Sequence, residues 1–531
     1  MPQQQANPVS TVDSLDKNWL NWYNSDSKKT RIQGASVNRA YEEFLKGKPP
    51  GKKIVVAVID CGVDINHVDL KGRIWVNKDE IPDNGIDDDK NGYIDDLHGW
   101  NFLGNGSGEN IAYENLEQVR IYRKLNPLFK DIKSLDNVPA DQQNEYKTYV
   151  RCREFYEREQ SKFQILRFNT EVFEKKLNEA ESVIEVHLDQ TTFTERDVYG
   201  ISSTRPYVIS AKDFMIGLYS QGFTKRTLPE MKEKTTLYLQ KYLNLEFEPR
   251  KIIGDNPEDI ADIKYGNNDV KGPFPAQGTM ISGIIGACRD NKSGVEGVAQ
   301  NVELMVLRVT LKGDERDKDV ALAIRYAVEN GANIINLSIG KTFSPQKNWI
   351  DEAVTFAGIH NVLIIHEAGN EAKNLDEADY FPDNKFLDGT KAENWITVGA
   401  SSMKADKELC AAFSNYGKQE VDLFAPGVKI ISLYPGDKYG TSFGTGMACA
   451  VVSGVAALVW SYYPELTAIE LKDILLASST LHPELKVTLP NLKSLEKTKV
   501  GFSMLSKTGG VVNALEALKL AENISRAKTK K

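Results

Sequence analysis

Short, continuous apolar runs alternate with amphipathic stretches over most of this chain. The first run, IVVAVID at residues 54–60, is rich in valine and isoleucine, which is typical of a strand buried on both faces of a parallel sheet. Similar runs occupy residues 302–309, 333–340, 361–369, 395–400, 421–427 and 429–434. Helical periodicity lies between some of them, at residues 319–331 and 349–360. The alternation predicts an α/β fold with a mostly parallel, doubly wound sheet.

The pattern changes between about residues 105 and 270, which are charged and rich in tyrosine. Apolar residues recur there at helical spacing, among them Tyr149, Phe155, Phe163, Ile165, Phe168 and Phe173. We therefore predict an N-terminal arm (1–50) that packs on the body, a body (51–104 and 271–526) and a helical insertion (105–270). The insertion either only enlarges the fold or serves as a lid or docking surface.

Composition narrows the function classes. The 531 residues are 41% hydrophobic, which can support a large core, and the net charge of −8 offers no basic surface for nucleic acid. No apolar run looks long enough to span a bilayer, so we expect no transmembrane segment. The five cysteines lack CxxC spacing, so neither a zinc site nor a disulfide framework is expected. The N-terminus lacks a signal-peptide pattern, which leaves a cytoplasmic protein or a mature exported form.

Seven stretches carry a family resemblance in order along the chain. They are VAVIDCGVDINHVDL (56–70), QGTMISGIIGA (277–287), NIINLSIG (333–340), HEAGNEAKN (366–374), FSNYG (413–417), LFAPG (423–427) and GTGMACAVVSG (444–454). Together they resemble the subtilisin-like serine proteases, in particular exported members from Bacteroidetes-type bacteria. The resemblance implies a three-layer α/β sandwich and a location in the periplasm, at the outer membrane or at the cell surface.

The resemblance also implies a catalytic centre that lacks two of its residues. Asp60 occupies the triad aspartate position and Asn370 the oxyanion-hole position, but Gln277 replaces the histidine base and Gly446 the nucleophilic serine. Acyl transfer needs a hydroxyl and a base that takes its proton, and glycine and glutamine supply neither. Because the motif departs from the pattern at several further positions, an engineered inactive form is a weaker explanation than natural loss of activity.

Substitutes for the missing groups are few. Ser442, in GTSF, would serve as nucleophile only if an extra helical turn preceded the following helix. His366 and His67 lie beside motifs, but we expect them to be packed or exposed rather than catalytic. Glu367 precedes the oxyanion motif and is not expected to replace the base. The resemblance further places a substrate-aligning edge at Ser338 and Gly340.

An acidic loop, NGIDDDKNGYIDD at residues 84–96, has the spacing of a calcium loop. It provides Asp87, Asp89, Asn91 and Asp95 as oxygen ligands and the carbonyl of Tyr93 as a fifth. His98 stands where an EF-hand has glutamate, and Asp96 could supply that oxygen. We expect structural calcium here, and the alternative is a solvated acidic turn.

These features predict a pseudoprotease, a catalytically inactive member that binds a peptide or protein partner, for example in an outer-membrane complex. Two alternatives remain. One is an active serine endopeptidase that uses Ser442 or another residue, and the other is a structural module stabilised by calcium.

Overall fold

The computed structural model describes residues 9, 11, 15, 16, 18–289, 291, 294–492 and 497–529, without the side chain of residue 529. The chain divides into two compact units. The first, here called the body, comprises Met1–Ala112 and Pro249–Lys531. The second, here called the helical unit, comprises Tyr113–Glu248.

A nine-stranded sheet forms the centre of the described part of the body. Its strands are β1 (Ile54–Asp60), β2 (Gly99–Asn101), β3 (Val302–Arg308), β4 (Ile334–Leu337), β5 (Leu363–Glu367), β6 (Trp395–Ser401), β7 (Leu423–Pro426), β10 (Thr480–Leu481) and β13 (Gly510–Val511). They lie in the order β10-β13-β7-β6-β5-β4-β1-β3-β2, and every pair is parallel except β10–β13. The predicted α/β fold with a mostly parallel sheet is therefore confirmed.

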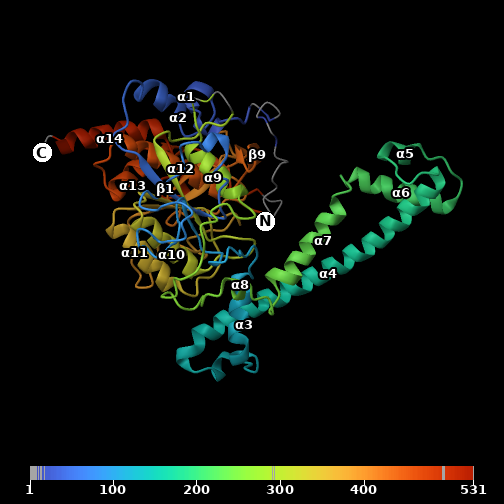
Figure 1. Ribbon diagram of the computed structural model, residues 1–531. Helices are drawn as coiled ribbons and strands as arrows, with labels where there is room; N and C mark the ends of the chain where they lie inside the picture. The colour runs from blue at the N-terminus through green and yellow to red at the C-terminus, as the bar shows by residue number, and fades with distance from the viewer. Residues whose placement is uncertain are drawn as a thin grey trace. The chain divides into compact units, whose positions relative to one another are not determined.

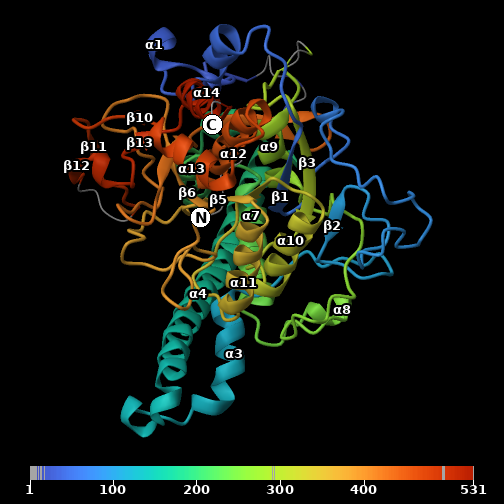
Figure 2. The ribbon, with the colours of Figure 1, turned by 90° about the vertical axis from the view of Figure 1, so that its left-hand side faces the viewer.

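Helices cover both faces of this sheet. The helices of the body are α1 (Ser27–Thr30), α2 (Val37–Arg39), α8 (Arg250–Ile253), α9 (Ala276–Gly286), α10 (Asp317–Glu329), α11 (Lys347–Ile359), α12 (Thr445–Tyr462), α13 (Ala468–Ala477) and α14 (Ala514–Thr529). The layer of α9 and α12 lies on one side of the strands and the layer of α10 and α11 on the other (Figures 1 and 2). The result is a three-layer arrangement.

The buried strands divide their side chains between two cores. In β1, Val56 and Val58 pack with α9 and α12, whereas Ala57 and Ile59 pack with α10. Successive side chains of a strand point to opposite faces, so a strand covered on both sides must be apolar throughout. This explains why the sequence shows continuous apolar runs instead of alternation.

Within the described part of the chain, one helix is as long and apolar as a membrane span. Helix α12 has 18 residues, and 94% of it is buried inside the body. It runs through the core on which α9, α13 and α14 also pack. Its apolar surface is therefore accounted for by packing within the fold.

The described part of the predicted arm packs onto the same core. Trp22 and Tyr23 are 1% and 0% exposed, and Val37 is fully buried. The Trp22 indole donates to the carbonyl of Lys429, and the Tyr23 hydroxyl donates to that of Glu296. These residues enclose the face of the body that carries α9 and α12.

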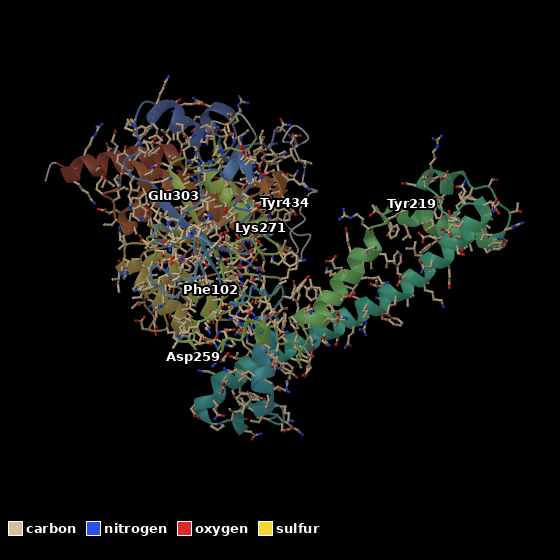
Figure 3. All side chains as sticks on the ribbon, viewed as in Figure 1. Phe102, Tyr219, Asp259, Lys271, Glu303 and Tyr434 are labelled. Carbon is tan, nitrogen blue, oxygen red and sulfur yellow. The ribbon has the colours of Figure 1, made fainter. Side chains whose placement is uncertain are left out.

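The helical unit is built around one long helix. Its elements are α3 (Glu117–Phe129), α4 (Gln143–Leu188), α5 (Glu195–Gly200), α6 (Pro206–Ser220), α7 (Thr227–Leu237) and a π-helical turn (Tyr238–Tyr242). Helix α4, with 46 residues, is about 69 Å long at about 1.5 Å per residue. One core near its middle contains Phe163 stacked on Tyr238, and a second near its end packs α4 against α5 and α6, where Tyr219 lies (Figure 3).

Three details of the sequence prediction are wrong. The helical unit is shorter than residues 105–270, because Ile111, Ile253 and Tyr265 pack in the core of the body. The run at 429–434 forms β8 (Ile430–Tyr434), which pairs in an antiparallel hairpin with β9 (Lys438–Ser442) and does not join the central sheet. Ile165 and Phe168, expected to pack, are 60% and 64% exposed on α4.

A second hairpin joins β11 (Lys486–Thr488) and β12 (Lys499–Gly501).

Candidate functional site

The carboxyl ends of β1, β4 and β5 lie side by side, because these strands are neighbours in the parallel sheet. Asp60 ends β1, Ser338 directly follows β4 and Glu367 ends β5. Helix α12 begins at the same place, since the Ser338 hydroxyl donates to the Gly446 carbonyl over 3.2 Å. Binding sites in open α/β sheets form at such strand ends.

Asp60 is a buried carboxylate without a cationic partner among the described residues. It is 1% exposed. Its Oδ1 accepts a hydrogen bond from the N–H of Cys61 (2.6 Å), and its Oδ2 accepts one from Nε2 of Gln277 (3.3 Å). Burial raises the pKa of Asp60 to about 6, and the hydrogen bonds from Cys61 and Gln277 oppose that rise only in part. A neutral amide thus stands where a charged partner would stabilise the carboxylate.

Gln277 lies in the first turn of α9 and joins two strand ends. Its Nε2 donates to Asp60 and also to the carbonyl of Ser338, at 2.9 Å. The side-chain amide is therefore held as a donor on both sides. An amide does not take up a proton near neutral pH, so this geometry provides no general base.

Gly446 is the second residue of α12 and is buried. A Cβ atom at this position would lie 3.2 Å from Cβ of Ser338 and 3.3 Å from Oε2 of Glu367. Both contacts are tight, so a small side chain would fit only after slight shifts of these neighbours. Residue 446 itself offers no atom that could attack a carbonyl group.

Hydrogen-bond donors remain at the start of α12. Oδ1 of Asn370 accepts the N–H of Thr445 at 2.8 Å, which fixes the orientation of the amide. The Nδ2 group of Asn370 and the N–H of Gly446 have no hydrogen-bond partner among the described residues. Two donors at a helix N-terminus suit an oxygen that carries partial negative charge.

Glu367 was considered in the sequence only as a replacement base and was given no role in the site, yet it lies within it. It is 7% exposed, its Oε2 accepts the Thr445 hydroxyl at 2.8 Å and its Oε1 accepts the Tyr380 hydroxyl at 3.1 Å. Burial raises the pKa of Glu367 to about 7, and the charges of Glu371 and Asp60 add to the rise. An acidic residue at the end of an otherwise apolar strand run was the signal available in the sequence.

The substitutes considered for the missing groups lie elsewhere or are engaged. Ser442, on β9, is 1% exposed, and its hydroxyl has no partner among the described residues. His366 is buried beside the Ile339 carbonyl, 2.9 Å from Nε2, and burial lowers its pKa to about 4. His67 is buried with Nε2 3.1 Å from the Lys438 carbonyl. None of these histidines forms a pair with a serine hydroxyl among these contacts.

The predicted substrate-aligning edge is open at one residue. The Ser338 carbonyl is engaged by Gln277, and Lys341 exchanges two 2.8 Å backbone hydrogen bonds with Phe381. The N–H and the carbonyl of Gly340, between them, have no partner among the described residues, and the residue is half-buried. A short stretch of unpaired backbone therefore borders the site.

In the acidic loop, three carboxylates converge. Ligand oxygens of Glu80, Asp87 and Asp89 lie within 4.8 Å of one another. Glu80 was not predicted from the loop spacing, because it precedes the loop. Burial is the main cause that raises the pKa of Glu80, and the charges of Asp96 and Asp89 add to it. Oxygen-rich clusters of this kind suit calcium, which prefers six to eight oxygen ligands.

Of the other predicted calcium ligands, Asn91 lies within the cluster and Asp95 is engaged elsewhere. The N–H of Asn91 donates to Asp87 and Asp89 at 3.0 Å each, so Asn91 lies within the cluster. Both oxygens of Asp95 instead accept backbone N–H groups, from residues 84 and 85. The ring of Tyr93 packs against Trp100 in the core, which leaves only its carbonyl for a cation.

The body is similar in sequence to known serine proteases. A model of the Subtilase family (peptidase S8) matches residues 51–510. Subtilisin DY of Bacillus licheniformis is 32% identical over 204 residues, which cover 38% of this chain and 70% of that protein. The major intracellular serine protease of Bacillus subtilis is 33% identical over 217 residues, 40% of this chain and 64% of its own length.

Among solved structures, a chain from the subtilase cytotoxin SubAB assembly aligns with a TM-score of 0.40 and 24% identity, over 48% of this chain and 79% of that one. The family match spans most of the sheet, both helical layers and the strand ends described above. The chain belongs to the subtilase family.

Proposed function

We propose that this protein is a pseudoprotease, a subtilase without peptidase activity that binds a peptide or protein. The observation that carries the proposal is the hydrogen bond of the Gln277 amide to Asp60, next to Ser338, whose hydroxyl donates to the carbonyl of Gly446. Neither the base nor the nucleophile of acyl transfer is available there. In subtilisin, loss of either group lowers kcat on the order of 10^6-fold.

The unpaired backbone of Gly340 supports peptide binding. An extended peptide can add a strand to an exposed edge, where backbone hydrogen bonds supply affinity. The free donors of Asn370 and Gly446 lie at the start of α12 and could hold a carbonyl oxygen of such a peptide. Binding of this kind requires no nucleophile.

Incubation with short fluorescein-labelled peptides tests both halves of the proposal. We expect saturable anisotropy increases for some peptides and weaker binding of their backbone N-methylated forms, which cannot pair with an edge. Mass spectra of the recovered peptides should show no cleavage. Cleavage that a single substitution at the site abolishes would contradict the inactive half, and a failure of all peptides to bind would contradict the binding half.

We further propose that calcium binds at Glu80, Asp87 and Asp89, with Asn91 beside them. The support is the chemistry of the cluster, in which three carboxylate groups lie close together and burial adds to the cost of the charge on Glu80. A bound cation would offset that cost and stabilise the adjoining core around Tyr93.

Calcium is expected to raise the Tm of the protein, and a chelator is expected to reverse the rise. A ligand present at about 100 times its Kd adds about 2.7 kcal/mol to the free energy of unfolding. The double variant D87N/D89N should lose the response, while D259N, on the surface of the body (Figure 3), should keep it. An equal response of all three proteins would show that calcium does not act at this loop.

We also propose that the protein works outside the cytoplasm, in the periplasm or at the outer membrane, with a protein or peptide as its partner. The support is the resemblance of this chain to exported members of the family. The family also has intracellular members, such as the major intracellular serine protease of Bacillus subtilis. Fractionation of cells that produce the natural gene product tests this. Recovery in the cytosolic fraction alone would contradict it.

A further inference from the structure

The space beyond Gly340 is occupied by the ring of Tyr380. A Cβ atom on Gly340 would lie 2.3 Å from Cζ and 2.4 Å from the hydroxyl oxygen of Tyr380. A Cβ atom on Gly369, which follows the end of β5 and has a φ of +97°, would lie 2.7 Å from Cζ of the same ring. Two glycines on neighbouring segments thus face one phenol ring at closer range than any side chain could.

The ring of Tyr380 is held at both ends. Its hydroxyl donates to Glu367, whose other oxygen accepts the hydroxyl of Thr445 in the first turn of α12. Its backbone lies next to Phe381, which pairs with Lys341 through two hydrogen bonds. A side chain fixed in this way fills its space, and a close-packed site does not accommodate a second ring in the same volume.

We propose that Tyr380, held by Glu367, fills the pocket that would otherwise receive a ligand side chain beside Gly446. The filled pocket is independent of the proposed function, but its consequence for the kind of peptide bound rests on that function. A peptide paired with Gly340 would direct alternate side chains into the body. The position that faces Tyr380 can then be only glycine, so the bound peptides carry glycine there.

The pocket itself is tested with p-cresol, which is the side chain of tyrosine cut at the Cα–Cβ bond. The variant Y380G should bind p-cresol, because deletion of this packed, half-buried ring leaves a space of the same shape for a small aromatic molecule. We expect p-cresol at millimolar concentration to raise the Tm of Y380G and to leave that of the natural protein unchanged. Y380F is the matched control: it keeps the ring, loses the bond to Glu367 and should not respond.

Y380A is measured in parallel, in case glycine at position 380 impairs folding. A variant that is recovered in soluble form only when p-cresol is present supports the proposal equally. If p-cresol stabilises neither Y380G nor Y380A, and aids the recovery of neither, Tyr380 does not fill a pocket and the proposal is overturned.

The consequence for ligands is tested with a peptide found to bind the natural protein. Replacing the peptide glycine that faces Tyr380 by phenylalanine should weaken binding to the natural protein by at least about tenfold. The same phenylalanine peptide should bind Y380G without this loss. If no peptide binds either protein while p-cresol binds Y380G, the proposed function fails and the filled pocket stands. If phenylalanine is accepted equally by both proteins, the selectivity part of the proposal is wrong.

Discussion

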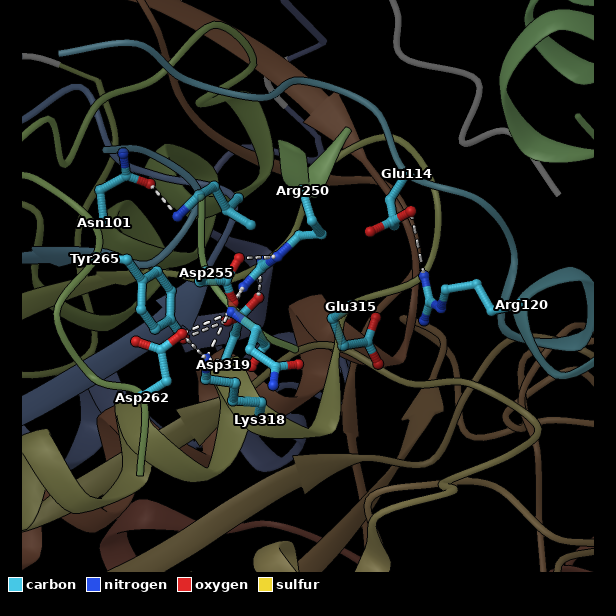
Figure 4. Close-up of polar contacts among 12 residues, drawn as sticks. Asn101, Glu114, Arg120, Arg250, Asp255, Asp262, Tyr265, Glu315, Lys318 and Asp319 are labelled. Carbon is cyan, nitrogen blue, oxygen red and sulfur yellow. Dashed lines mark hydrogen bonds and ion pairs between the residues drawn. The ribbon is translucent and has the colours of Figure 1, made fainter. Parts of the chain in front are cut away.

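Replacing Arg250 by methionine is expected to lower the free energy of unfolding by about 3–5 kcal/mol, the range for breaking a buried ion pair. Arg250 follows the helical unit and donates to Asp319 at 2.7 and 3.1 Å and to Asp255 at 2.8 Å. Lys318 and the hydroxyl of Tyr265 complete the cluster (Figure 4). The side chains of Arg250, Asp255, Lys318 and Asp319 are at most 7% exposed.

The cost arises because methionine leaves two buried carboxylates with less compensation. The matched control is K53M, which removes the surface pair of Lys53 with Glu303 and should cost about 0–1 kcal/mol. The side chains of Lys53 and Glu303 are 46% and 27% exposed. Urea unfolding of both variants measures the difference. Equal losses for R250M and K53M would mean that the buried cluster does not stabilise the body.

The second large effect concerns Glu367 and depends on pH. Its pKa is about 7 in the folded protein, against an ordinary value of 4.5. The folded state therefore holds a proton that the unfolded state releases, so stability falls as the pH rises from about 4.5 to about 7. At about 1.4 kcal/mol per pKa unit, the ionised carboxylate costs about 3 kcal/mol above pH 7.

The variant E367Q should accordingly be more stable than the natural protein at pH 8, by about 2–3 kcal/mol, and differ little at pH 4. Glutamine keeps the size of the side chain, and its oxygen can still accept a hydrogen bond from a hydroxyl group. E303Q, at the surface, should follow the natural protein at both pH values. Unfolding curves for E367Q and the natural protein that run in parallel across this pH range would contradict the account of a buried, uncompensated charge.

The sequence predicts the long strands of the central sheet well because they are covered on both faces. β1 begins and ends at the predicted residues, and β3 and β6 differ from prediction by one residue at one end. The strand β2 was missed because GWN is too short to form an apolar run. β8 was assigned to the wrong sheet because its pattern resembles that of a central strand, and only its partner β9 reveals the hairpin.

For the site, motif order predicted which residues meet at the strand ends, including Asp60, Gln277 and Gly446. It did not predict Glu367 or Tyr380. Both lie beside Gly446 or the glycine edge through tertiary packing, and neither matches a motif position that marks a role. The acidic loop illustrates the same limit, since Glu80 joins Asp87 and Asp89 from outside the loop.

The central claim, that this subtilase cannot form a covalent acyl-type adduct, is tested most directly with a fluorophosphonate probe and intact-mass analysis. An active subtilisin serves as the positive control. We expect the purified protein to keep its unmodified mass under conditions that label the control completely. A stoichiometric mass increase located on one serine, Ser442 included, would contradict the account.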